Sequence, residues 1–209
     1  MALRERLAPP VLELVHKVLE RKPFMIELRR KLVAGAAGRV LEVGAGPGFN
    51  LPYYPGDVEE VVLTDDVAGM LHRAERRARV AAASVTTRQA PVERLPFEDA
   101  SFDTVVASLL LCSVDDQDRA LAEIRRVLRP GGQYLFLEHV RSEVPRIAGR
   151  QDALEPIWRV IGFGCHPNRA TLSRIEAAFR VEDVERGELP AGPKIVRPYV
   201  LGRAMTFRS

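Results

Sequence analysis

The sequence has little of what disulfide-rich and metal-binding proteins are built from. Its 209 residues include only two cysteines and four histidines. Cys112 and Cys165 are too few for a disulfide framework and lack the spacing of a zinc motif, and the histidines are scattered along the chain. This usage excludes a disulfide-stabilised secreted domain, indicates no metal site, and is typical of a protein of the reducing cytoplasm.

Long apolar runs and blocks of like charge are also missing. No stretch approaches the roughly 18 apolar residues that a membrane-spanning helix needs, and residues 1–6 already carry charge. Acidic and basic residues are interleaved, so the net charge of +3 leaves no concentrated basic patch for a nucleic acid. These absences predict a small-molecule partner and no nucleic acid, and they leave the oligomeric state undetermined.

The apolar residues that are present predict one domain with a helical N-terminal cap. They recur at helical spacing in residues 11–19 and, after Pro23, in residues 24–33. We therefore expect a cap over residues 1–35 and a core over residues 36–209. The basic residues of the cap leave two interpretations open: a lid over a ligand pocket, or an amphipathic surface in peripheral contact with a membrane. The wide apolar stripe favours the lid.

Strand and helix patterns alternate from residue 36 onward. Runs rich in β-branched residues predict strands at 39–43, 61–64, 85–89, 102–107 and 133–140, with two more in 181–206. Helical patterns occupy 67–80, 116–128, 150–161 and 170–179. This alternation predicts an α/β, Rossmann-like, doubly wound sheet, mostly parallel, that binds ligands at the carboxyl ends of its strands.

Three glycines, Gly44, Gly46 and Gly48, follow the first predicted strand. A glycine loop between a strand and a helix lets the backbone approach a ligand closely and directs helix N-terminal amides at it. The third glycine comes one position earlier than in the dinucleotide fingerprint, which argues against NAD. An ordinary tight turn, the alternative interpretation, needs neither three glycines nor the acid Glu42.

Asp65 and Asp66 end the second predicted strand, about 20 residues beyond the glycine loop. A carboxylate at this place can accept hydrogen bonds from both ribose hydroxyls of an adenosyl ligand. Asp65 follows the strand directly, so we assign it this role and expect Asp66 to cap the next helix. The reverse assignment is the alternative.

Four segments carry the strongest pattern in the chain: Glu42–Gly48, Val92–Phe97, Ser101–Asp103 and Val127–Gly132. In this order they resemble the motifs of class I S-adenosylmethionine-dependent methyltransferases. Similarity to the branch that includes alkyl thiol methyltransferases rests on Leu110–Val114, Leu137–Val140, Leu154–Trp158, Gly164–Cys165 and Val196–Tyr199. The resemblance covers about residues 36–206. It implies a seven-stranded sheet with a reversed last strand.

The resemblance also implies S-adenosylmethionine as the cofactor. Glu42 would order the glycine loop and face the methionine amine, and Asn50 would lie near the carboxylate. Residues 92 and 93 would flank the adenine, and residues 107 and 108 would close the methionyl end. The full implied set of cofactor contacts is Glu42, Gly44, Ala45, Gly46, Gly48, Asn50, Asp65, Asp66, Val92, Glu93, Ala107 and Ser108.

The chemistry expected from this resemblance needs few catalytic groups. Methyl transfer from a sulfonium is an in-line displacement, so the protein mainly orients the acceptor and excludes water. A thiol, with a reference pKa near 8.5, reaches its nucleophilic form with modest help. Residues 107–110 are mostly apolar, do not resemble the Asn/Asp-Pro-Pro-Tyr motif of amino-group methylation, and favour a small apolar acceptor.

Four residues are candidates for the acceptor side: Cys112, His139, Cys165 and His166. His139 could act as a base, steer the acceptor or satisfy a helix end. His166 is a second candidate catalyst, and with Cys165 it could wall the acceptor site or be a plain loop residue. A thiol is the favoured acceptor. Quinone, phenol or lipid-amine acceptors, an NAD-linked oxidoreductase and a non-catalytic adenosyl-binding scaffold are the alternatives.

Overall fold

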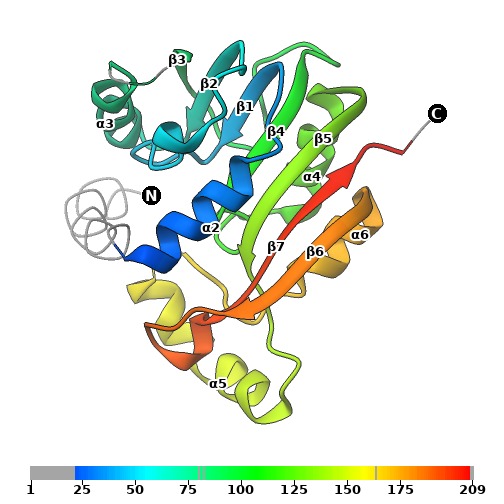
Figure 1. Cartoon of the computed structure of the whole chain (residues 1–209). Coiled ribbons are helices and arrows are strands. Elements are labelled where there is room, and N and C mark those ends of the chain that lie inside the picture. Colours follow the sequence, from blue (N-terminus) through cyan, green and yellow to red (C-terminus); the bar gives the residue numbers. More distant parts are fainter. Residues whose placement is uncertain (1–21, 80, 82, 163, 208–209) are drawn as a thin grey trace.

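A seven-stranded sheet forms the middle layer of the computed structural model, which describes residues 22–79, 81, 83–162 and 164–207 (Figure 1). The strands are β1 (Arg39–Val43), β2 (Glu60–Asp65), β3 (Ser84–Gln89), β4 (Phe102–Ser108), β5 (Leu128–His139), β6 (Arg180–Glu188) and β7 (Pro198–Met205). Their order is β3-β2-β1-β4-β5-β7-β6, and only β7 runs antiparallel to its neighbours. The doubly wound sheet with a reversed last strand is thereby confirmed.

The carboxyl ends of β1, β2 and β4 meet at one edge of the sheet. Val43 at the end of β1 is aligned with Thr64 of β2 and with Ala107 of β4. The chain proceeds from β1 outward to β2 and β3 on one side, and continues with β4 and β5 on the other. This reversal creates the crevice in which doubly wound sheets bind ligands.

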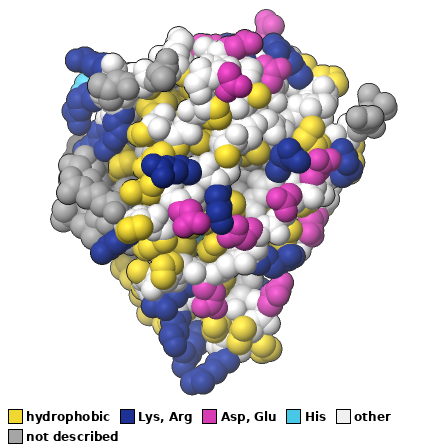
Figure 2. Space-filling view, in the orientation of Figure 1, with side chains coloured by type: hydrophobic (Ala, Val, Ile, Leu, Met, Phe, Trp, Pro, Cys, Tyr) yellow, Lys and Arg dark blue, Asp and Glu magenta, His cyan; other side chains and the backbone are white. Residues whose placement is uncertain are grey.

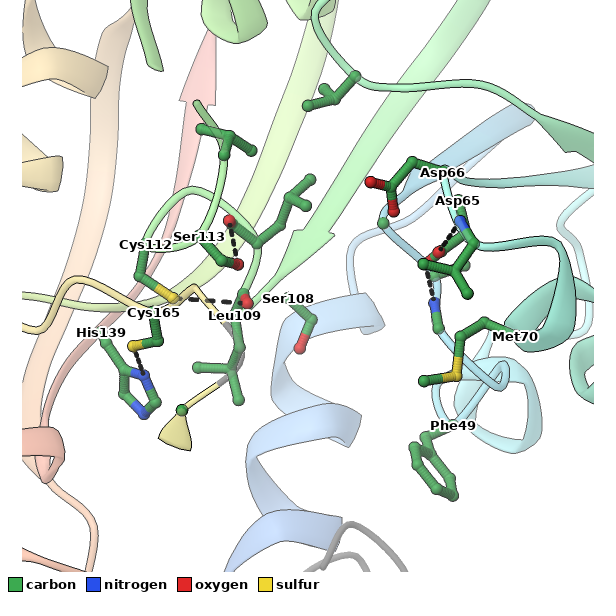
Figure 3. Close-up of a pocket in the computed structure, with 18 of the residues that line it drawn as sticks. Phe49, Asp65, Asp66, Met70, Ser108, Leu109, Cys112, Ser113, His139 and Cys165 are labelled. Atoms are coloured by element: carbon green, nitrogen blue, oxygen red, sulfur yellow. Dashed lines mark hydrogen bonds between the residues drawn. The ribbon is translucent and has the colours of Figure 1, made fainter. Parts of the chain in front are cut away.

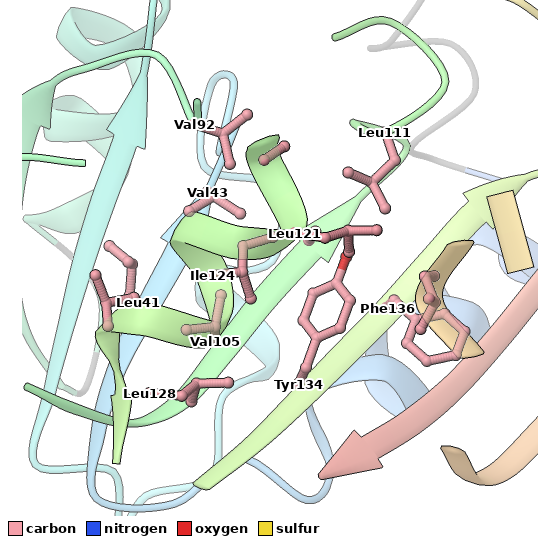
Figure 4. Close-up of a cluster of buried hydrophobic side chains, with 14 of the residues drawn as sticks. Leu41, Val43, Val92, Val105, Leu111, Leu121, Ile124, Leu128, Tyr134 and Phe136 are labelled. Carbon is pink, nitrogen blue, oxygen red and sulfur yellow. The ribbon is translucent and has the colours of Figure 1, made fainter. Parts of the chain in front are cut away.

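Helices cover both faces of the sheet and bury an apolar core on each. They are α2 (Pro23–Val33), α3 (Ala68–Ala78), α4 (Gln117–Val127), α5 (Pro145–Ile161) and α6 (Thr171–Ala178), with 3₁₀ turns η1 (Leu51–Tyr53) and η2 (Lys194–Val196). On one face, Leu121 and Ile124 of α4 pack with Val105 and Tyr134 of the sheet (Figure 4). Burying one such side chain contributes about 1.5–3 kcal/mol to the stability of the fold. This packing holds α4 on the sheet beneath the site.

Helix α2 lies on the opposite face, in the same core cluster as α3. It starts with Pro23, which suits the first turn of a helix, and it buries Met25, Leu28 and Leu32. The helix predicted in residues 11–19 lies outside the described residues. No helix in the described part of the chain is both long and apolar enough to cross a bilayer.

Three expectations about the elements need correction. The helix expected after the glycine loop is only the turn η1, because Pro52 is tolerated in a first turn while Pro55 removes a backbone donor and blocks its extension. β5 begins at Leu128 rather than 133, because Leu128 already pairs with Phe102 before the register shifts. α5 begins at Pro145, ahead of the expected residue 150.

Candidate functional site

A cavity of about 840 Å³ opens at the carboxyl ends of β1, β2, β4 and β5. Its walls come from the glycine loop, the ends of the strands, the segment after β4, the end of α5, and Phe24, Met25 and Arg29 of α2. Figure 3 shows the glycine-loop side and the Cys112 side facing each other across it. The volume is within the range of small-molecule sites.

The glycine loop leaves room for a ligand against its backbone. Gly44, Gly46 and Gly48 all have positive φ, at 60°, 54° and 78°. A side chain at Gly44 would collide with Leu110, whereas a Cβ at Gly46 would meet no protein atom within 4 Å. Gly46 lines the cavity, so a side chain there would project into open space where a ligand can approach.

Glu42 is buried beneath this loop at the centre of a hydrogen-bond network. Its carboxylate accepts hydrogen bonds from Asn50 Nδ2 at 2.9 Å and from the Tyr54 hydroxyl at 2.7 Å. Arg29 of α2 donates to Asn50 Oδ1 at 2.5 Å and lies 3.4 Å from the Ser108 hydroxyl. Burial raises the pKa of Glu42 to about 7, although Tyr54, Arg29 and Asn50 favour its ionised form.

Asp65 lies at the end of β2 and lines the cavity. One carboxylate oxygen accepts a hydrogen bond from the Gly46 N–H and the other from the Val67 N–H, each at 2.9 Å. Burial raises its pKa to about 6, against these two bonds. Each oxygen keeps a further lone pair, so the carboxylate can still accept hydrogen bonds from a ligand.

Asp66 is exposed and also lines the cavity. The expectation that it caps the next helix is wrong, because Val67 is the N-cap residue of α3 and no side chain caps that helix. The Val67 amide is instead bound by Asp65, which leaves the Asp66 carboxylate beside the cavity.

Most of the remaining predicted cofactor residues also border the cavity. They are Ala45, Val92, Glu93 and Ser108. Gly48 packs against Ala74 of α3, and Asn50 lies one layer behind the cavity, on Glu42. Ala107 is fully buried in the core under the sheet, so it does not border the cavity that Ser108 reaches.

The opposite end of the cavity brings three of the predicted acceptor residues together. Cys112, His139 and Cys165 line it, and one ligand atom from each lies within 4.8 Å of the others. Cys165 Sγ lies 3.8 Å from His139 Nδ1. The close approach of the two thiols raises the pKa of Cys112 and lowers the pKa of Cys165, and His139 also favours the ionised form of Cys165.

His166 is separate from this group. Its Nδ1 lies 2.7 Å from a carboxylate oxygen of Glu155 in α5, and its side chain does not line the cavity. Its backbone N–H donates to the carbonyl of Cys112 at 2.7 Å, which ties together the two segments that carry the cysteines.

Two residues that position the site were missed by sequence reasoning. Arg29 is a buried arginine within an amphipathic helix, and its burial became apparent only once α2 packed on the sheet. Glu138 is fully buried, and one of its oxygens accepts hydrogen bonds from the Leu110 and Leu111 N–H groups at 3.1 and 3.0 Å. An acid beside His139 in an otherwise apolar strand was the available signal for Glu138.

Comparison with known proteins identifies the family. The family model for a methyltransferase domain matches residues 41–136. The human thiol S-methyltransferase TMT1B is 34% identical over 204 residues, which is 91% of this chain and 80% of that protein. The chain belongs to the class I S-adenosylmethionine-dependent methyltransferases.

Two further similarities support the assignment of this chain to the methyltransferases. A phosphatidylethanolamine N-methyltransferase from Cereibacter sphaeroides is 33% identical over 162 residues, covering 77% of this chain and 78% of that one. The crystal structure of a SAM-dependent methyltransferase from Aquifex aeolicus has a TM-score of 0.64 and 19% identity, covering 91% of this chain and 96% of that one. The structural likeness supports the fold, and the sequence relatives establish the enzyme class.

Proposed function

We propose that this methyltransferase moves a methyl group from S-adenosylmethionine to the sulfur of a small, apolar thiol. The observation that carries the proposal is the similarity to thiol S-methyltransferases over nearly the whole chain. It includes the segments that carry Cys112, His139 and Cys165 at the acceptor end of the cavity. S-adenosylmethionine supplies an electrophilic methyl group, so the chain's own residues chiefly bind, orient and exclude water.

The residues around the glycine loop fit an adenosyl sulfonium. Gly46 leaves open space for close backbone contact, and the Asp65 carboxylate has lone pairs for ribose hydroxyls. Val92 supplies an apolar wall for a base. Glu42, whose carboxylate is held by hydrogen bonds from Asn50 and Tyr54, would hold the amino-acid end.

The acceptor end is suited to an apolar molecule. Leu109, Leu110 and Val196 line it together with Trp158 and Ile161 of α5. Several apolar side chains of α5 are exposed, among them Ile157, Val160 and Ile161. Hydrophobic and basic side chains both gather at the end of the molecule where α5 lies (Figure 2). An apolar acceptor would displace water from the cavity on entering, and the exclusion of water strengthens electrostatic interactions inside the site.

A lipid amine is the second candidate acceptor. It is favoured by the relative from Cereibacter sphaeroides and by the exposed apolar side chains of α5, which would suit peripheral contact with a lipid surface. Both acceptor classes share the cofactor site and differ only in the nucleophile.

Product analysis with methyl-labelled S-adenosylmethionine tests the proposal. The acceptors are a panel of alkyl and aryl thiols, matched phenols and hydroquinones, and vesicles containing phosphatidylethanolamine. We expect S-methyl thioethers to form, with larger kcat/KM for the more apolar thiols and inhibition by S-adenosylhomocysteine. Turnover of the vesicles or phenols with none of the thiols would contradict the thiol assignment. Tight binding of S-adenosylhomocysteine without any turnover would favour a non-catalytic scaffold.

A further inference from the structure

Cys112, His139 and Cys165 form a compact cluster although they are far apart in the sequence. His139 and Cys165 are separated by 26 residues, and their Nδ1 and Sγ atoms lie 3.8 Å apart. Both cysteines are buried free thiols. In a tetrahedral zinc site with Zn–S near 2.3 Å and Zn–N near 2.1 Å, the sulfur and nitrogen ligand atoms would lie about 3.6 Å apart. Small side-chain rotations would bring all three atoms, now within 4.8 Å, onto one ion.

The backbone around Cys112 is held by several hydrogen bonds, one of which joins it to the segment that carries Cys165. Glu138 binds the N–H groups just before Cys112, and Gln117 Nε2 and Arg169 Nη1 donate to the Leu111 carbonyl at 3.0 and 2.9 Å. The Cys112 carbonyl accepts from the His166 N–H. A site whose ligands are fixed in advance loses less entropy when it binds an ion.

The cluster also faces the cavity, so a bound ion would have an open position. Two cysteines and one histidine supply three ligands, which is the pattern of catalytic rather than structural zinc sites. Thiolate and imidazole ligands suit zinc, whereas magnesium and calcium prefer oxygen. With two thiolates and a neutral imidazole, the net charge at a divalent ion is zero, which reduces the cost of burial.

We propose that Cys112, His139 and Cys165 bind a zinc ion whose fourth position takes the sulfur of the acceptor thiol. The inference rests on the proposed thiol acceptor. A coordinating thiol loses its proton to solvent. A sulfur lone pair of the thiolate then forms the new bond to the methyl carbon. The bond between that carbon and the donor sulfonium breaks with its electron pair left on the donor sulfur, and no oxidation takes place. The products are a thioether and S-adenosylhomocysteine.

Metal titration of the full chain tests the site. Reduced protein is stripped with a chelator and titrated with Zn²⁺, and with Co²⁺ as a spectroscopic probe. We expect one equivalent of each, with a thiolate-to-cobalt charge-transfer band and the intense visible bands of tetrahedral Co²⁺. Cys112→Ser, Cys165→Ser and His139→Ala should each lower zinc affinity by at least about tenfold. His72→Ala, at an exposed position of α3, is the control and should leave zinc affinity unchanged.

A second readout tests the fourth position without turnover. Adding an apolar thiol to the cobalt protein in the absence of a methyl donor should strengthen the charge-transfer band, and a matched alcohol should not. Folded reduced protein that binds no metal, or variants that bind it as well as the native chain, would overturn the site. An unchanged cobalt spectrum on thiol addition would overturn the role of the fourth position.

The two proposals fail in different ways. Thiol methylation by chelator-treated protein that carries no metal would refute the role of zinc in activating the acceptor and leave the proposed function standing. Stoichiometric zinc binding through the three residues, with no methylation of any thiol, would refute the proposed function and leave the metal site standing.

Discussion

Arg29 and Asn50 are hydrogen-bonded to each other in the interior, although 21 residues separate them. This bond ties α2 to the segment after the glycine loop, and Asn50 passes the connection on to Glu42. The position of α2 is therefore coupled to the end of the cavity where the amino-acid part of the cofactor is proposed to lie.

Replacing Arg29 by alanine should affect both stability and ligand binding. We expect Arg29→Ala to lower the free energy of unfolding by about 1.5–3 kcal/mol, because hydrogen bonds to charged groups contribute this much. Affinity for S-adenosylhomocysteine should fall as well. Urea unfolding and calorimetry measure the two effects. Arg30→Ala is the control: Arg30 is the exposed neighbour, its guanidinium lies over the Tyr53 ring, and its loss should cost no more than about 1 kcal/mol. Equal effects of the two variants would contradict the coupling.

The two acids after β2 should differ in their contribution to cofactor binding. Asp65→Ala should weaken binding of S-adenosylhomocysteine by about 1.5–3 kcal/mol, because it removes a charged acceptor of the ribose hydroxyls. Asp66→Ala, at the exposed neighbouring position, should cost much less. Calorimetric titration of both variants decides the assignment, and a larger loss for Asp66→Ala would reverse it.

Glu42 should make the stability of the ligand-free protein depend on pH. Its pKa is about 7 in the folded chain, above the ordinary value of 4.5. Between these values the folded state holds more protons than the unfolded state, so this contribution to stability declines as the pH rises from 4.5 to about 7 and is constant above that. Urea unfolding measures the free energy of unfolding of the native chain and of Glu42→Gln. The value for the native chain minus the value for the variant should decrease as the pH rises over this range. A difference that grows with pH, or does not change, would refute the prediction.

A side chain at Gly46 should interfere with the ligand more than with folding. The φ of 54° makes alanine cost about 1–2 kcal/mol in stability, but its Cβ would meet no protein atom. We therefore expect Gly46→Ala to remain folded and to bind S-adenosylhomocysteine more weakly, with a greater loss for Gly46→Val. Gly56→Ala is the matched control, because Gly56 has open space without a positive φ and does not line the cavity. Unchanged affinity in both Gly46 variants would place the ligand elsewhere.

The sequence by itself determined the architecture and predicted the residues proposed for the cofactor half of the site. The β-branched run at β1, the three glycines after it and Asp65 at the end of β2 are local patterns, because strand period, positive φ and strand-end position are properties of neighbouring residues. Local patterns did not predict boundaries such as the start of β5, since Leu128 joins this strand by pairing with Phe102 of another strand.

Only the tertiary structure decided which residues meet. The bond between Arg29 and Asn50 and the cluster of Cys112, His139 and Cys165 join segments that no spacing rule connects. Parallel strands return to the same edge after long crossovers, so the residues at their carboxyl ends converge regardless of their separation along the chain. The sequence therefore predicted the edge of the sheet at which the cavity lies, and the folded sheet decided which side chains surround that cavity.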